Sequence, residues 1–286
     1  MQSCTLCPRA CGADRMAGEA GLCGSPSVMR IARAALHHWE EPVISGKNGS
    51  GAVFFTGCGL HCVYCQNDAI SSDAMRGRTV TPQELSRIFT RLENEGAHNI
   101  NLVSASQYVP LIIEALSLRR PSVPVVYNSS GYESLDTLRR LDGFVDIYLP
   151  DYKYAISETA ARYSGAPDYP ETALLAIKEM KRQCKEPVLE GGLMKKGLLI
   201  RHLVLPLNVK NTVAVLQSIK RHFPGVPVSL MAQYTPAGKA YAYPELNRRV
   251  TRREFDRAAD EMIRLDLDGF VQSLDAADAG YIPEFL

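Results

Sequence analysis

Apolar runs recur along the chain from residue 51 onward and alternate with amphipathic segments. Most of these runs are unbroken, which is typical of strands buried on both faces of a parallel sheet. They cover residues 52–55, 100–103, 123–127, 144–149, 198–205 and 226–231. A shorter run at residues 270–274 is a candidate for a seventh strand. The pattern therefore predicts a sheet of six or seven parallel strands.

The segments between the runs carry helix signals. Residues 81–84, TPQE, form a capping box with proline at the first helical position, and Leu85, Ile88 and Phe89 then mark one apolar face. Residues 251–254, TRRE, repeat the box. Alternation of strand and helix predicts an α/β fold with right-handed crossovers. An open doubly wound sheet and a complete or partial barrel both satisfy this pattern.

Polar residues follow nearly every apolar run, at the point where each strand is expected to end. They are Ser104, Ser106 and Gln107 after the second run, Asn128 and Ser129 after the third, Asp151 and Lys153 after the fourth, and Gln233 after the sixth. In a barrel the reactive groups lie in the loops that leave the C-terminal ends of the strands. We therefore predict a partial (β/α)6 barrel of the TIM type over residues 51–286. Residues 1–50, which hold four cysteines, are predicted to form a small N-terminal lobe.

A cluster of cysteines comes directly after the first run, in FFTGCGLHCVYCQN at residues 54–67. Cys58, Cys62 and Cys65 have the spacing C-x3-C-x2-C. Three thiolates on one loop can hold three irons of a [4Fe–4S] cluster and leave the fourth iron open to a ligand. A partial zinc site is the alternative, but it would lack a ligand. The preceding strand and the flanking glycines, Gly57 and Gly59, favour the cluster.

This spacing, with the aromatic Tyr64 before the last cysteine, resembles the signature of the radical S-adenosylmethionine (radical SAM) superfamily. The phrase GCGLHCVYCQN resembles its glycyl-radical activating-enzyme branch, typified by pyruvate formate-lyase activating enzyme. Together with CTLCPRAC and HHWEEPVISGKNGSG, it is similar to a subgroup of homologues of that activase. The resemblance covers most of the chain and is strongest over residues 4–70 and 123–154.

The resemblance implies an enzyme. Its [4Fe–4S] cluster would bind S-adenosylmethionine and cleave it reductively to a 5′-deoxyadenosyl radical, which abstracts hydrogen from a substrate. The substrate would be a glycine of a partner glycyl-radical enzyme, or else a small molecule or another macromolecule. A flavodoxin- or ferredoxin-type protein would supply the electron. A non-catalytic iron–sulfur carrier or sensor is the alternative from a different class.

The family roles transfer to matching positions only. Cys58, Cys62 and Cys65 match the cluster ligands, and Tyr64 matches the position beside the adenine. The resemblance also implies cofactor contacts from the strand ends: Asn128, Ser129 and Asp151 at a carboxylate or monovalent-cation site, Lys153 as a cationic partner of the carboxylate, and Gln233 facing the cofactor. A helix cap for Asp151 and a surface charge for Lys153 are the structural alternatives. In the fifth run either Arg201 or His202 could face the pocket.

One stretch departs from the family pattern. The activase has Gly-Gly-Glu at the end of its second strand, where its carboxylate holds the methionine ammonium. This chain has NLVSASQYVP there, with no carboxylate. The oxygens of Ser104, Ser106 or Gln107 are the available acceptors, and neutral oxygens are weaker partners for an ammonium.

The N-terminal cysteines have the spacing C-x2-C-x3-C-x11-C. They are Cys4, Cys7, Cys11 and Cys23. Four thiolates close a tetrahedral site that admits either zinc or an iron–sulfur cluster. A cluster would relay electrons, whereas zinc would staple a lobe that has little core of its own. Both readings stay open.

Composition narrows the setting. The formal net charge of +1 gives no argument for a nucleic-acid surface or a membrane surface. No apolar stretch is long enough to span a bilayer, and the N-terminus lacks the apolar core of a signal peptide. We therefore expect a cytoplasmic protein, in which clustered cysteines indicate metal binding rather than disulfides.

Overall fold

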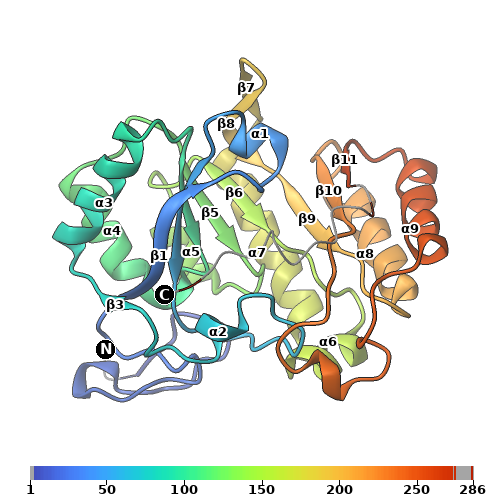
Figure 1. The fold of residues 1–286 in the computed structure, drawn as a ribbon, viewed down its shortest axis with the longest axis horizontal. Helices are drawn as coiled ribbons and strands as arrows, with labels where there is room; N and C mark the ends of the chain where they lie inside the picture. The colour runs from blue at the N-terminus through green and yellow to red at the C-terminus, as the bar shows by residue number, and fades with distance from the viewer. Residues whose placement is uncertain (1–2, 273, 275–284, 286) are drawn as a thin grey trace.

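Strands and helices alternate from residue 50 onward in the computed structural model, which describes residues 3–272, 274 and 285 (Figure 1). The strands are β1 Arg30–His37, β2 Ser50–Phe55, β3 Arg78–Thr79, β4 Ile100–Val103, β5 Val125–Ser129, β6 Ile147–Pro150, β7 Val188–Glu190, β8 Leu193–Leu198, β9 Ile200–Leu203, β10 Val228–Met231 and β11 Gly269–Val271. The α-helices are α1 Pro42–Ser45, α2 Asp68–Ser71, α3 Pro82–Asn94, α4 Val109–Leu118, α5 Leu135–Arg140, α6 Ser157–Ser164, α7 Tyr169–Cys184, α8 Val209–His222 and α9 Arg252–Arg264.

The parallel strands form a partial barrel, which confirms the predicted fold class. Strands β2, β4, β5, β6 and β8 pair in parallel in that order, and β9, β10 and β11 form a second parallel sheet. A single bridge between Asp151 and Arg201 links β6 to β9 across the seam. The helices lie outside the strands, with α3 and α4 on one side and α8 and α9 on the other (Figure 1).

Two of the predicted strands differ in detail. The run at residues 198–205 is divided: β8 ends at Leu198 and pairs with β6, whereas β9 begins at Ile200 and pairs with β10. One apolar run therefore contributes a strand to each of the two sheets. The seventh strand exists as β11, parallel to β10, but it ends at Val271. Of the rest of that predicted run, residue 273 lies outside the described part of the chain.

Three strands were not predicted. Strand β1 runs antiparallel along β2, β3 pairs with β1, and β7 forms a hairpin with β8. The sequence of β1, RIARAALH, mixes charged and apolar residues, and all of them except Ile31 and Ala32 are only half-buried. By pairing with β2, it covers an edge that would otherwise expose unpaired backbone groups.

The helix signals of the sequence are confirmed. Thr81 and Glu84 form a capping box at the start of α3, and Thr251 and Glu254 form another at the start of α9. The apolar face of α3 is buried in the main core cluster, which also holds the strand side chains that face the helices, whereas Phe54 and Val103, which line the cavity, belong to a separate cluster. No helix in the described residues is long and apolar enough to cross a lipid bilayer.

Candidate active site

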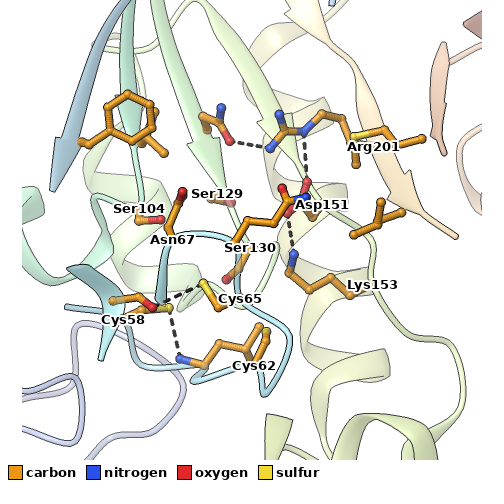
Figure 2. A pocket seen from close by; sticks show the side chains of 18 of the residues that line it. Cys58, Cys62, Cys65, Asn67, Ser104, Ser129, Ser130, Asp151, Lys153 and Arg201 are labelled. Atoms are coloured by element: carbon orange, nitrogen blue, oxygen red, sulfur yellow. Dashed lines mark hydrogen bonds and ion pairs between the residues drawn. The ribbon is translucent and has the colours of Figure 1, made fainter. Parts of the chain in front are cut away.

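A cavity of about 210 Å³ opens inside the barrel. The loop after β2 lines it with Cys58, Cys62 and Cys65, and the ends of β4, β5, β6, β9 and β10 supply the facing wall. Figure 2 shows the three cysteines on one side of this cavity and Asp151, Lys153 and Arg201 on the other. Residues that the sequence spreads over nearly 150 positions therefore share one space.

Each of the three cysteine sulfurs accepts a hydrogen bond. The backbone N–H of Leu60 points to Sγ of Cys58 (3.5 Å), the Ser164 hydroxyl donates to Cys62 (3.2 Å) and the Ser71 hydroxyl donates to Cys65 (3.3 Å). Such donors stabilise thiolates that ligate a metal and tune the potential of an iron–sulfur cluster. The donor set therefore fits three cluster ligands.

The loop can follow this path because Gly57 has no side chain. Its φ is +81°, and a Cβ there would lie 2.2 Å from Oγ of Ser25 and 2.6 Å from the carbonyl oxygen of Cys23. Any other residue would clash with the N-terminal lobe. The glycine before the first cysteine is thus required by the close approach of a second segment.

Burial raises the pKa of the Cys58 and Cys65 thiols. The effect is largest from desolvation, with a further contribution from the neighbouring Cys62, and the pKa of Cys65 reaches about 12. Without a metal, the thiols of Cys58 and Cys65 would be protonated at neutral pH, so a cationic metal centre is needed to hold these two as thiolates. The geometry and the protonation state both point to a metal-binding loop. Among the described residues, however, no three His, Cys, Asp or Glu side chains converge as ligands of a single metal ion.

The opposite wall carries a charged network centred on Asp151. Nζ of Lys153 lies 2.6 Å from one carboxylate oxygen of Asp151, and Nε of Arg201 lies 2.9 Å from the other. Nη2 of Arg201 also donates to Oδ1 of Asn128 (2.6 Å). Burial alone would raise the pKa of Asp151, but Arg201 and Lys153 hold it below its usual range. Neither structural alternative from the sequence applies, since Asp151 caps no helix and Lys153 is not on the surface.

Six of the predicted cofactor residues line the cavity: Ser104, Asn128, Ser129, Asp151, Lys153 and Gln233. Two others from the β4 loop do not. The side-chain amide of Gln107 donates to the carbonyls of Thr56, Gly57 and Ser104, so it fastens the start of the cysteine loop. The Ser106 hydroxyl donates to Glu133 (2.7 Å), behind the cavity wall. Both line a small neighbouring pocket instead.

Tyr64 is part of the core rather than of the cavity wall. Only 5% of its surface is exposed, and its ring lies edge-on to Tyr154, Tyr163 and Tyr234. Its hydroxyl accepts a hydrogen bond from Tyr154 (2.7 Å). In this structure Tyr64 therefore anchors the cysteine loop to the core.

In strand β9, the side chain of Arg201 points into the cavity and that of His202 points away from it. Nδ1 of His202 donates to the carbonyl of Tyr152 (2.7 Å), and its Nε2 accepts from the Thr212 hydroxyl of α8 (2.9 Å). Burial lowers the pKa of His202 to about 4, so it is neutral near pH 7. Alternation along a strand places one of two neighbours on each face, and the ion pair with Asp151 identifies Arg201 as the inward one.

Sequence reasoning missed Glu40 and Glu41. They lie between β1 and α1, and both line the cavity. Glu40 accepts from Arg201 (3.0 Å), Asn101 (3.0 Å) and Asn128 (3.1 Å). The only signal in the sequence was a pair of acids before a proline, which is common on protein surfaces.

The N-terminal cysteines lie beside the cluster loop. Cys7, Cys23 and Cys58 together line a pocket of about 30 Å³. Arg9 fastens the two parts: its guanidinium donates to the carbonyls of Gly59 and Leu60 and, on α6 and its cap, to those of Ser164 and Gly165. The lobe is therefore an integral support of the loop.

Comparisons with known proteins bear on the fold. No protein-family model matches the chain. Uncharacterized protein MJ0674 of Methanocaldococcus jannaschii is 29% identical over 277 residues, which cover 93% of this chain and 76% of that protein. Among solved structures, methylornithine synthase (PylB) superposes with a TM-score of 0.50 at 14% identity over 74% of this chain and 63% of its own.

Two further structures agree. SuiB of Streptococcus suis bound to S-adenosylmethionine superposes with a TM-score of 0.50 at 12% identity, over 77% of this chain and 46% of SuiB. The enzyme anSMEcpe, with bound AdoMet and a Kp18Cys peptide, gives the same TM-score and identity over 76% of this chain and 60% of its own. The chain has the fold of the radical SAM enzymes. It spans less than two thirds of the length of these structural relatives.

Proposed function

We propose that this protein is a radical SAM enzyme, which cleaves S-adenosylmethionine reductively and uses the product radical to abstract hydrogen from a substrate. One observation carries the proposal: three cysteines in C-x3-C-x2-C spacing and the network of Asp151, Lys153 and Arg201 line the same cavity. The fold shared with structures that hold S-adenosylmethionine supports it.

In this proposal Cys58, Cys62 and Cys65 hold a [4Fe–4S] cluster. When bound, the cluster supplies the electron for cleavage of the sulfonium. The buried wall of the cavity excludes water and stray hydrogen donors around a reactive radical, as such chemistry requires. Ser71 and Ser164 keep the thiolates hydrogen-bonded.

The cofactor is held by the wall opposite the cysteines. Lys153 faces the methionine carboxylate with its ammonium, and Asn128, Ser129 and Asp151 offer oxygens to the same region or to a monovalent cation there. Ser104 is the acceptor left for the methionine ammonium from the β4 loop, because Ser106 and Gln107 are committed elsewhere. Its φ of +57° is strained for serine, which is a feature of functional positions.

The finer assignments follow from the resemblance in sequence. The subgroup is that of the glycyl-radical activases, the hydrogen donor is a backbone glycine of a partner enzyme, and the electron comes from a flavodoxin- or ferredoxin-type protein. A small-molecule substrate is the main alternative. Cys4, Cys7, Cys11 and Cys23 bind a second metal, either zinc or an iron–sulfur cluster.

Electron paramagnetic resonance of the reconstituted, dithionite-reduced protein tests the cofactor. We expect the signal of the reduced cluster to change when S-adenosylmethionine is added, because one iron gains new ligands. A Lys153→Met variant should form the cluster but require more S-adenosylmethionine for the same change. A spectrum that stays the same at saturating S-adenosylmethionine would favour the electron-carrier alternative.

A further inference from the structure

The cavity reaches the end of the barrel opposite the cysteine loop. His37, the last residue of β1, pairs with Ser50, the first residue of β2, whereas the cysteine loop follows the last residue of β2. Glu40 and Glu41 follow β1 after two intervening residues, so they lie toward the starts of the parallel strands. They nevertheless line the same cavity as the three cysteines. We call Glu40 and Glu41 the barrel floor.

The carboxylates of Glu40 and Glu41 differ in their hydrogen bonding. Both oxygens of Glu40 are hydrogen-bonded, to Asn101, Asn128 and Arg201. Glu41 is only 4% exposed, and its Oε2 has no hydrogen-bond partner in the described residues. It stands at the N-cap of α1 without forming a cap hydrogen bond. A buried carboxylate oxygen without a donor is costly, so its retention calls for an occupant.

Two further acceptors, one beside Glu40 and one on the cavity wall, are left without a partner in the described residues. Oδ1 of Asn101 is buried without a partner, and the orientation of this amide is fixed because its Nδ2 donates to Glu40. Gln272, on the cavity wall, leaves Oε1 unpaired in the described part of the chain. The hydroxyl of Ser229, which can donate as well as accept, lies beside Glu41. A group that fits such a set must bring hydrogen-bond donors.

Charge points the same way. The cavity wall carries the carboxylates of Glu40, Glu41 and Asp151 against the cations of Lys153 and Arg201. The hydrogen bonds of Arg201 go to Asp151, Glu40 and Asn128, and none of these three goes to Glu41. The wall therefore has three acidic side chains for the two cations. Trp39 also lines this cavity, and an aromatic ring can contribute to binding a cation.

We propose that the barrel floor binds an organic cation with N–H donors, a primary ammonium or guanidinium group of the substrate, and that Glu41 is its carboxylate partner. The inference rests on the proposed function, which places the substrate in this cavity. The ammonium of S-adenosylmethionine does not fill this role, because in that function it lies at the cysteine end. The cation comes either from a small amine or from a lysine or arginine side chain.

Anaerobic calorimetry of the reconstituted protein, with and without S-adenosylmethionine, tests the site. The probes are n-butylammonium against 1-butanol and guanidinium against urea, at low millimolar concentration and constant ionic strength. We expect each cation to bind more tightly than its neutral counterpart, and Glu41→Gln to weaken cation binding about 10- to 100-fold. The surface variant Glu186→Gln should bind as the wild type does. Cations that bind no better than the neutral probes, or equally well to Glu41→Gln, would overturn the proposal.

Two controls keep the result interpretable. The comparison of charged and neutral probes uses only the wild type, so it stands even if Glu41→Gln folds poorly. A capped Gly-Lys-Gly peptide tests whether the cation comes from a lysine side chain. Binding of the peptide or of n-butylammonium supports the site, and the one that binds more tightly identifies the source of the cation. Formation of 5′-deoxyadenosine is measured separately. Cleavage without cation binding overturns this inference alone, whereas Glu41-dependent binding without cleavage overturns the proposed function and leaves the cation site.

Discussion

Asp151 and Arg201 join the two sheets of the barrel. They form the bridge between β6 and β9, and their side chains meet at 2.9 Å inside the cavity. The same ion pair therefore closes the seam of the barrel and forms the wall of the candidate active site. This double role links stability to ligand binding.

Asp151→Asn should destabilise the fold. The change leaves the cations of Arg201 and Lys153 without their shared counter-charge, and breaking a buried ion pair costs about 3–5 kcal/mol. Denaturant unfolding of the two proteins measures the difference. The matched control is Asp136→Asn, whose exposed pair with Arg139 should contribute under about 1 kcal/mol. An equal loss of unfolding free energy in Asp151→Asn and Asp136→Asn would contradict the stabilising role of the pair at the seam.

The N-terminal cysteines should keep a metal when the cluster loop has none. In a variant with Cys58, Cys62 and Cys65 all changed to Ala, we expect metal analysis to find zinc or iron at the second site. Adding Cys7→Ala should remove it, because a tetrahedral site with three thiolates is incomplete. The identity of the retained metal decides between zinc and a cluster. A triple variant that purifies and reconstitutes without bound metal would rule out the second site.

Arg9→Ala should loosen the cluster loop without touching a cysteine. The guanidinium of Arg9 donates to four carbonyls on the loop and on the end of α6, and a Lys cannot replace this planar fork. We expect the variant to lose its cluster to a chelator several-fold faster than the wild type, with Arg140→Ala, on the exposed face of α5, as the control. Equal rates in all three proteins would mean that the lobe does not support the loop.

Glu133 should make stability depend on pH. It is 2% exposed, and burial raises its pKa to about 7, although hydrogen bonds from Ser106 and Tyr127 lower it. The folded protein therefore holds this proton more tightly than the unfolded chain, whose glutamates titrate at about 4.5. The favourable contribution is complete below pH 4.5 and is lost as the pH rises to about 7, a change of about 3 kcal/mol at most.

Replacing Glu133 with Gln should abolish this part of the pH dependence. The measurement is the difference between the unfolding midpoints of the wild type and Glu133→Gln across pH 5 to 8. We expect the wild type to lose stability relative to the variant as the pH rises. A difference that is constant over this range would show that Glu133 ionises at its ordinary pKa.

The parts of the site that could be predicted from sequence are local. The cysteine spacing lies within eight residues of one loop, and the polar residues after each strand meet because parallel strands end at one edge. Buried strands appear in the sequence as unbroken apolar runs, so the barrel could be predicted from the alternation of these runs with amphipathic segments. Lys153 and Asp151 are only two residues apart on the loop after β6.

The floor of the barrel could not be predicted in this way. Glu40 and Glu41 lie there because β1 pairs antiparallel with β2. The sequence of β1 mixes charged and apolar residues, so its pattern does not predict a strand. Likewise, nothing local shows that the side chains of Ser106 and Gln107 turn away from the cavity, since Glu133 and the carbonyls that bind them come from other segments. Such contacts between segments distant in sequence are set only by the assembled fold.

The most direct test of the account is the formation of 5′-deoxyadenosine. The protein is reconstituted with iron and sulfide under anaerobic conditions, reduced with dithionite and supplied with S-adenosylmethionine. We predict 5′-deoxyadenosine from the wild type and from Cys184→Ala, whose buried thiol lies outside the site, and none from Cys62→Ala. A wild-type protein that carries its cluster but forms no 5′-deoxyadenosine, or a Cys62→Ala variant that forms as much, would contradict the proposed function.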